Sequence, residues 1–158
     1  MPFGTEVQIL KIEKIHTNGE MDIRTRGKGV FRMDEYFKEV SNKLYSGADI
    51  TRIKNEDNGD LFQAEQILEM AVELFKVLKI KKKLPTVPSA FKTFHWGHLM
   101  GFSIQQEYEM LCLTAEKDRQ FFMLKHLTRL LPVVRKMDIL KKRAQLNGHF
   151  KNVIPPKL

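Results

Sequence analysis

The sequence predicts an α+β protein in which a small β unit precedes a larger helical unit. From residue 6 to residue 53, apolar residues tend to alternate with polar ones, whereas from residue 61 onward they recur with the helical period of 3.6. The polar, turn-rich run at residues 55–60 marks the change of period. We therefore predict a β subdomain over residues 1–56 and a helical subdomain over residues 57–158.

The composition is that of a folded, basic protein. Of the 158 residues, 42% are hydrophobic and 29% are charged, which is close to the globular average and far from the composition of disordered chains. Lysine and arginine outnumber aspartate and glutamate by 27 to 19, so the net charge is +8. Such a charge favours anionic partners, which include nucleic acid, anionic membrane surfaces and acidic proteins.

The sequence indicates neither disulfides nor a targeting segment. Cys112 is the only cysteine, which excludes an intrachain disulfide and a multi-cysteine zinc site. The first ten residues contain no basic stretch followed by a long apolar run, and nowhere do about 18 apolar residues follow one another. We therefore expect a cytoplasmic protein without a membrane partner.

Two strand-like runs flank a hairpin signal near the N-terminus. Residues 6–15 alternate at Val7 and Ile9, although Ile12 and Ile15 fall out of strict phase. The pair Asn18-Gly19 tolerates positive φ and predicts a tight turn, after which residues 21–25 form the return strand.

The remainder of the β unit is less regular. The segment Gly27-Lys28-Gly29 predicts a second tight turn, followed by a short strand at residues 30–33. Residues 48–53 alternate again and predict another strand, whereas residues 34–44 stay ambiguous because their apolar side chains have helical spacing.

The longest apolar pattern predicts a helix over residues 61–78, with Asp60 as its N-cap. Lysines at its C-terminal end complement the helix dipole, and Pro85 and Pro88 prevent its continuation. The expected buried face consists of Leu61, Ala64, Ile67, Leu68, Ala71, Leu74, Phe75 and Leu78.

Two more helices are predicted after a loop that carries aromatic residues. The first runs from Leu99 to Leu113. The second begins after Thr114 and meets Pro132, which either kinks it or opens a successor helix. It continues to Asn147-Gly148, a common C-terminal cap pair.

No motif with a catalytic or metal-binding mechanism is present. Gly27-Lys28-Gly29 is too short for a phosphate-binding loop. His95 and His98 have the spacing of a shared metal site, but residues 74–106 contain no acid to complete it. Cys112 lies in an apolar helical stretch, where a thiol usually behaves as a small core residue. We therefore expect no catalytic residue, no metal and no cofactor.

The same acid-free stretch, residues 74–106, holds six lysines interleaved later with aromatic residues. The candidate patch for anions or nucleic acid comprises Lys79, Lys81, Lys82 and Lys83. The candidate polypeptide-binding residues are Phe91, Phe94, Trp96 and Phe102, whose rings could also stack on bases. A simpler interpretation stays open, in which the lysines form a solvated helix end and the aromatic side chains fill the gap between the subdomains.

A series of glycines and apolar residues recurs in a characteristic order along most of the chain. In the β unit the series is Phe3-Gly4-Thr5, Val7, Ile9, Gly19, Gly27, Phe31, Tyr45 and Ala48. In the helical unit it is Glu116-Lys117-Asp118-Arg119-Gln120, Leu124 and Arg129-Leu130. This order resembles the N-terminal substrate-binding domain of the Lon ATP-dependent proteases, which belong to peptidase family S16.

The resemblance implies a partial PUA-like β barrel followed by a helical bundle. Val30 stands where the family commonly has a basic residue, and the proline-rich first strand and early helix of such domains are missing before Met1. An open barrel would expose unpaired strand edges. A longer parent chain or a mis-set start is the favoured explanation; a strand-donating partner and a different pairing of residues 1–25 are the alternatives.

Within Lon proteases this domain helps to recognise polypeptide substrates, while separate domains hydrolyse ATP and carry out proteolysis. The resemblance therefore implies a protein that is not an enzyme and that binds unfolded or exposed polypeptide segments. An oligomer or a strand-donating partner stays open. The alternative is a basic PUA-like module that binds RNA, a function indicated by the net charge of +8 and the lysine run.

Overall fold

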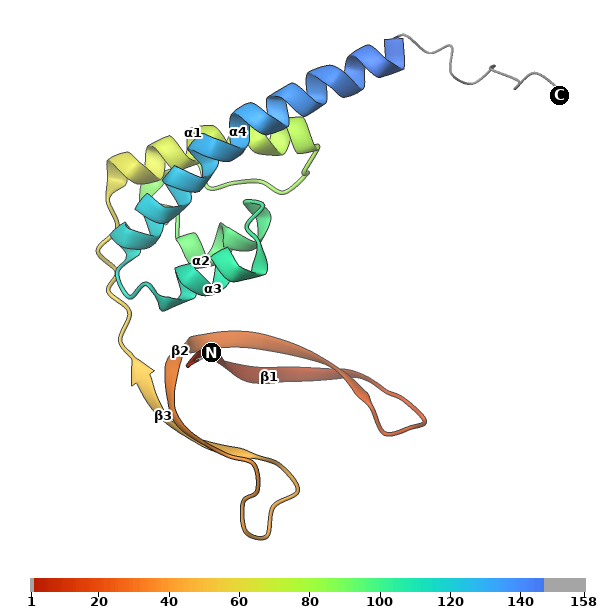
Figure 1. Cartoon of the computed structure of the whole chain (residues 1–158), viewed down its shortest axis with the longest axis vertical. Coiled ribbons are helices and arrows are strands. Elements are labelled where there is room, and N and C mark those ends of the chain that lie inside the picture. The colour runs from red at the N-terminus through yellow and green to blue at the C-terminus, as the bar shows by residue number, and fades with distance from the viewer. Residues whose placement is uncertain (1, 147–158) are drawn as a thin grey trace, which may run out of the picture. The chain divides into compact units, whose positions relative to one another are not determined.

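The computed structural model describes residues 2–146 and shows a three-stranded sheet followed by helices, which confirms the predicted α+β class (Figure 1). The predicted helix end at Asn147-Gly148 lies outside the described residues. The strands are β1 (Phe3–Ile15), β2 (Met21–Phe37) and β3 (Gly47–Ile53). The helices are α1 (Leu61–Leu78), α2 (Thr93–Trp96), α3 (Ile104–Cys112) and α4 (Glu116–Leu146), with short 3-10 turns at Pro88–Ala90 and Gly97–Leu99.

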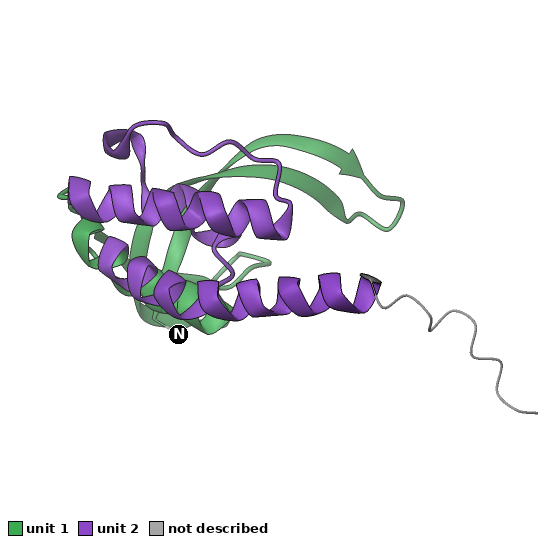
Figure 2. Cartoon of the chain, turned by 90° about the horizontal axis from the view of Figure 1, so that it is seen from above, with its two compact units in different colours: residues 1–58, 103–119 green, residues 59–102, 120–158 purple. Residues whose placement is uncertain are grey.

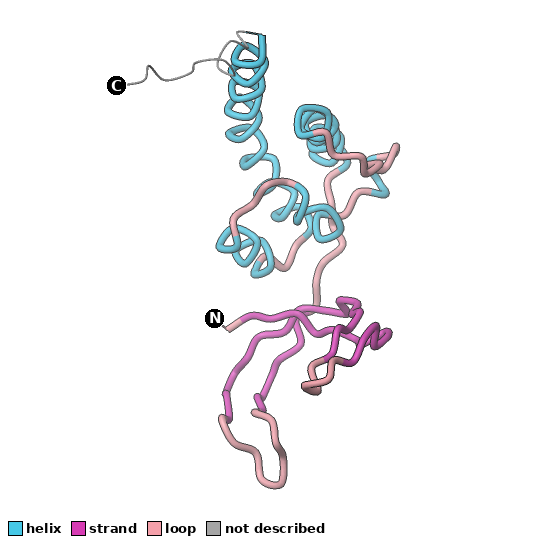
Figure 3. Tube along the Cα trace, turned by 90° about the vertical axis from the view of Figure 1, so that its right-hand side faces the viewer, coloured by secondary structure: helices cyan, strands magenta, loops and turns pink. Residues whose placement is uncertain are grey.

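The sheet is antiparallel in the order β1-β2-β3, and its strands are drawn in magenta in Figure 3. The predicted turn between β1 and β2 is confirmed, since Gly19 has a φ of +87° that only glycine adopts readily. The predicted second turn at Gly27-Lys28-Gly29 is wrong. β2 runs straight through it, because Gly27 pairs with Val7, Gly29 pairs with Glu6, and Lys28 is absorbed as a bulge.

The ambiguous segment after residue 33 extends β2 as far as Phe37, where Tyr36 pairs with Ala48 of β3. Few side chains of this sheet are buried. Among the residues of the three strands, Val30 alone is buried, at the place where β2 pairs with both neighbours. The sheet therefore has little core of its own.

The predicted helix α1 and its cap are confirmed. Asp60 Oδ1 accepts a hydrogen bond of 2.8 Å from the Gln63 amide. At the other end Lys79 adopts a left-handed conformation, and the Ile80 amide donates to the Phe75 carbonyl at 2.9 Å. The buried face runs from Ala64 to Phe75, whereas Leu61 and Leu78, at the two helix ends, are exposed.

Two of the predicted helical boundaries differ from those in the structure. The helix predicted from Leu99 begins at Ile104 as α3, because Ser103 and Gln106 form a reciprocal capping box there. The predicted aromatic loop contains the short helix α2. Pro132 neither ends α4 nor opens a new helix, since one helix continues through it to Leu146.

Contacts divide the chain into two compact units, coloured separately in Figure 2. Unit 1 consists of residues 1–58 and 103–119, so α3 and the first turn of α4 belong with the sheet. Unit 2 consists of residues 59–102 and the chain from residue 120 onward. Whether residues 1–56 and 57–158 behave as the two predicted subdomains stays a prediction.

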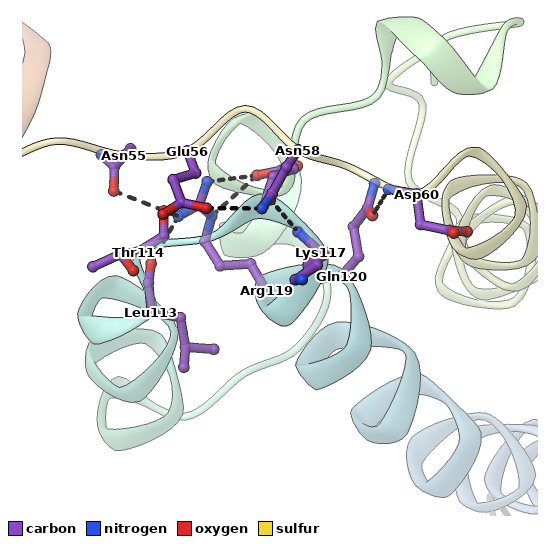
Figure 4. Close-up of polar contacts among 10 residues, drawn as sticks. Asn55, Glu56, Asn58, Asp60, Leu113, Thr114, Lys117, Arg119 and Gln120 are labelled. Carbon is purple, nitrogen blue, oxygen red and sulfur yellow. Dashed lines mark hydrogen bonds and ion pairs between the residues drawn. The ribbon is translucent and has the colours of Figure 1, made fainter.

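Within unit 1, a buried ion pair organises the start of α4 (Figure 4). Arg119 donates to Glu116 Oε2 from Nε at 3.0 Å and from Nη2 at 2.8 Å, and both side chains are buried. Arg119 Nη1 also donates to the carbonyls of Leu113 at 2.7 Å and Thr114 at 3.0 Å. Arg119 thus donates to two carbonyl groups of the short segment that follows α3.

The segment after β3 is hydrogen-bonded to the loop between α3 and α4 and to the start of α4. The Glu56 amide donates to the Thr114 carbonyl at 2.9 Å, and the Glu116 amide donates to the Glu56 carbonyl at 3.0 Å (Figure 4). Asn58 Oδ1 accepts from the Lys117 amide at 3.3 Å. We call this arrangement, together with the Arg119–Glu116 pair, the α3–α4 joint.

Candidate functional site

Unit 2 contains an open groove of about 920 Å³ along one side of α1, which we call the α1 groove. One wall is a face of α1 and the other is the segment that follows the helix. The lining residues are Glu65, Leu68, Glu69, Val72, Phe75, Lys76, Ile80, Lys82, Lys83, Leu84, Pro85, Thr86 and Pro88. The lining is mainly apolar and carries charges of both signs.

The helical wall follows from side-chain spacing. Glu65, Leu68, Val72 and Lys76 lie three or four residues apart, so their side chains share one side of α1 over about three turns. Leu68 is buried, whereas Val72 is 58% exposed at the open part of the groove. Val72 is the apolar contact most accessible to a ligand on this wall.

The opposite wall follows from the way α1 ends. The left-handed residue Lys79 turns the chain out of the helix, and the Ile80 amide closes the turn on the Phe75 carbonyl. Pro85 and Pro88 then keep the following segment from becoming helical. This segment presents Leu84 and the two proline rings to the groove, opposite the helix.

The charges of the groove are separated by sign along the sequence. Glu65 and Glu69 come from the N-terminal half of α1, whereas Lys76 lies near its C-terminal end and Lys82 and Lys83 follow shortly after. A ligand with separated charges would therefore be favoured in one orientation.

The predicted aromatic residues are not gathered into one surface. Phe91 is 2% exposed and belongs to the core of unit 2, and Phe94 is partly exposed on α2. Trp96 lies under Lys82, whose Nζ is 5.5 Å from the ring centroid. The ring of Trp96 thus contacts a residue of the groove.

Phe102 belongs to a separate aromatic cluster. Its ring centroid is 5.6 Å from that of Phe122 and 4.2 Å from that of His126. His126 Nε2 is 3.0 Å from the Met100 carbonyl, and burial holds the pKa of His126 below its ordinary value. This cluster packs the loop before α3 against α4 within unit 2.

The predicted lysines line two different hollows of unit 2. Lys82 and Lys83 line the α1 groove, as described. Lys79 lines a second hollow of about 430 Å³, where Lys141 and Lys142 of α4 also lie. Lys81 is exposed and lines neither.

The helical wall of the groove was not predicted from the sequence. Val72 is not among the residues of the predicted buried face of α1, and neither Glu65 nor Glu69 was predicted to line a site. The signal in the sequence was Val72, an apolar residue at a position where the helical period predicts a polar one.

Other kinds of site find little support in the part of the chain that the structure describes. Among residues 2–146, no three histidine, cysteine or carboxylate side chains are grouped so that they could hold a metal ion. Within the same range, none of the helices combines the length and the apolar character needed to cross a membrane.

Comparison with known proteins yields a structural likeness. No family profile matches the sequence, and no curated protein matches it. The fold is similar to that in the crystal structure of a Lon N-terminal domain protein from Xanthomonas campestris, with a TM-score of 0.55 and 16% identity over 79% of this chain and 68% of that chain. The predicted likeness to the Lon N-terminal domain is therefore confirmed at the level of the fold.

Proposed function

We propose that this chain is a non-catalytic, cytoplasmic recognition module that binds unfolded polypeptide segments in the α1 groove. The observation that carries the proposal is an open groove with an apolar lining, an accessible Val72 and charges at its sides. The similarity of the fold to a Lon N-terminal domain supports it.

A polypeptide segment suits this groove because its apolar side chains can cover the exposed apolar residues of the lining. Apolar side chains of the segment would cover Val72, Leu84 and the proline rings, and each fully buried side chain contributes about 1.5–3 kcal/mol before entropic costs. Two or three such contacts are enough for a weak complex with little sequence preference. The glutamates and lysines lie at the rim, where charges affect orientation and association rate more than affinity.

The direct test replaces Val72 with glutamate. A charge at the accessible part of the groove must be desolvated when an apolar segment binds, so we expect Val72→Glu to weaken the binding of a permanently unfolded, fluorescently labelled polypeptide at least about tenfold. Fluorescence polarisation measures the affinity. The matched control is Val133→Glu, because Val133 on α4 is 54% exposed, against 58% for Val72, and does not line the groove. Equal binding by both variants would refute the proposal.

RNA is the competing ligand, and Lys76, Lys82 and Lys83 in one groove are the observation that favours it. Phosphate contacts release counterions, so affinity for single-stranded RNA would fall steeply with salt, and Lys82→Glu/Lys83→Glu would reduce that slope by about two. Polypeptide binding through apolar contacts would change much less. Saturable, strongly salt-dependent RNA binding that Val72→Glu leaves intact would replace the polypeptide proposal with the RNA one.

A further inference from the structure

The hairpin of β1 and β2 extends beyond the reach of β3 (Figure 1). β3 pairs with β2 from Val30 to Phe37, so the hairpin from residue 7 to residue 27 is a two-stranded ribbon, which we call the arm. Within the described residues no strand pairs with the outer edge of β1. An isolated two-stranded ribbon is marginally stable in water, so an added strand at this edge would stabilise the arm.

Two bulges decide which side chains share a face of the arm. The register of β1 shifts between Ile9 and Lys11 and again between Ile12 and Lys14, so Leu10 and Glu13 are extra residues. Each bulge resets the alternation by one residue. This explains why Ile12 and Ile15 are out of phase in the sequence.

As a result, the apolar residues of the arm lie on one face. Paired residues of an antiparallel ladder project to the same side, and Ile12 pairs with Ile23 while Ile15 pairs with Met21. The apolar face consists of Val7, Ile9, Ile12, Ile15, Met21 and Ile23. These six side chains are 46–66% exposed, and together they form a contiguous patch of the kind that marks an interaction site.

The opposite face of β1 is polar and basic. It presents Gln8, Lys11 and Lys14, which pair across the ladder with Arg26, Arg24 and Asp22. Glu13, at a bulge, accepts ion pairs from Lys11 at 2.7 Å and Arg24 at 2.8 Å. Along its outer edge, β1 thus offers apolar residues on one face and lysines on the other.

We propose that the arm binds an extended polypeptide segment in which apolar and acidic residues alternate, and that this segment adds as a strand to the outer edge of β1. Its backbone would complete the unpaired hydrogen bonds of β1, as in other strand-addition complexes. Its apolar side chains would extend the apolar face, and its acidic side chains would lie beside Lys11 and Lys14. The arm belongs to unit 1, so this interaction does not depend on the α1 groove.

The basic row disfavours a second copy as the added strand. If two β1 strands paired antiparallel at their outer edges, the rows that hold Gln8, Lys11 and Lys14 would face each other and bring like charges together. An acidic row removes this repulsion. The same complementarity predicts discrimination between peptides of equal hydrophobicity.

The test uses three synthetic peptides of about ten residues, long enough to span the arm at about 3.4 Å per residue. One alternates valine with glutamate, one alternates valine with lysine, and one has the composition of the first in a non-alternating order. We expect the full chain to bind the first at least about tenfold more tightly than the other two in fluorescence polarisation, with new hydrogen-exchange protection in β1. Equal binding of all three peptides, or self-association in sedimentation without peptide binding, would overturn the proposal.

Variants of the chain locate the interaction. Ile12→Asn should weaken the valine–glutamate peptide at least about tenfold, whereas Ile139→Asn on α4, a similarly exposed isoleucine, should not. Lys11→Glu/Lys14→Glu should reverse the preference in favour of the valine–lysine peptide, a gain that misfolding cannot produce. Val72→Glu should leave peptide binding to the arm unchanged, so failure of the groove and failure of the arm can be told apart.

Discussion

The sheet of unit 1 exposes isoleucine side chains, whereas helix α1 of unit 2 buries its isoleucine. Ile67 of α1 is 0% exposed and belongs to the buried core, whereas Ile12 of β1 is 47% exposed. In unit 2 the apolar residues stabilise the fold from within. In the arm they are exposed, so the two regions should respond very differently to mutation.

The sheet is attached to the rest of unit 1 at two places. The Phe3 amide donates to the Tyr108 hydroxyl of α3 at 3.1 Å, and the α3–α4 joint fastens the segment after β3. The stability of unit 1 should therefore depend more on this polar joint than on the apolar side chains of its strands.

The largest expected effect is at the joint. Arg119→Met removes the counter-charge of the buried Glu116 and the side-chain donor to the Leu113 carbonyl, so we expect the free energy of unfolding to fall by about 3–5 kcal/mol. Urea denaturation followed by circular dichroism measures it. Arg129→Met, at an exposed arginine of the same helix, should cost less than about 0.5 kcal/mol. Similar losses in both variants would show that the joint is not a stabilising element.

The second expected effect compares one substitution in the two regions. Ile67→Ala opens a cavity in the core and should cost about 2–5 kcal/mol. Ile12→Ala removes an exposed side chain and should cost less than about 0.5 kcal/mol, when no partner covers the arm. Thermal unfolding measures both. A large loss in Ile12→Ala would mean that the arm is covered within the chain itself.

A smaller effect is expected where β1 and β2 pack most closely. A Cβ atom at Gly4 would lie 2.5 Å from Cζ of Phe31, the residue with which Gly4 pairs. Gly4→Ala should therefore cost about 1–3 kcal/mol through overpacking. The double variant Gly4→Ala/Phe31→Leu should recover part of that loss, because leucine is shorter than the ring. Additive losses in the double variant would exclude this contact as the cause.

The smallest effect depends on pH. Burial lowers the pKa of His126 in the folded state, so the unfolded state takes up a proton first as pH falls. The stability that neutral His126 provides is present above the unfolded pKa, near 6.5, and is lost as pH falls below it. His126→Gln should cost about 1 kcal/mol at pH 8, where the hydrogen bond to Met100 is lost, and less at pH 5. A difference that grows toward pH 5 would contradict this assignment.

Local signals in the sequence predicted the elements that depend on local physics. The cap at Asp60, the apolar stripe of α1 and the positive φ at Gly19 are properties of a few adjacent residues, and the structure confirms all three. The continuation of β2 through Gly27 and Gly29 was not predictable in this way. It depends on pairing with Val7 and Glu6, which lie twenty or more residues away.

The candidate sites likewise combine features that local sequence signals predict with features that depend on contacts between distant residues. The phase error at Ile12 and Ile15 was visible in the sequence, but its meaning required the bulges that the ladder reveals. The lysines and aromatic residues read as one basic, aromatic stretch, yet Phe91 is in the core and Lys79 lines a different hollow from Lys82. The left-handed residue Lys79 turns the chain out of α1. Residues that are close in the sequence therefore line different hollows.

The division of α4 between the units affects how the protein can be dissected. The chain passes between the units three times, after residues 58, 102 and 119, and the last passage lies inside a continuous helix. A protease cut after residue 58 would therefore make residues 1–58 a separate chain, while residues 103–119 of unit 1 would stay covalently joined to unit 2. A recombinant fragment of residues 1–58 would carry the sheet but would lack Tyr108 and the part of the α3–α4 joint that residues 113–119 supply. Separate production of unit 1 calls for residues 1–58 fused to residues 103–119 through a short linker.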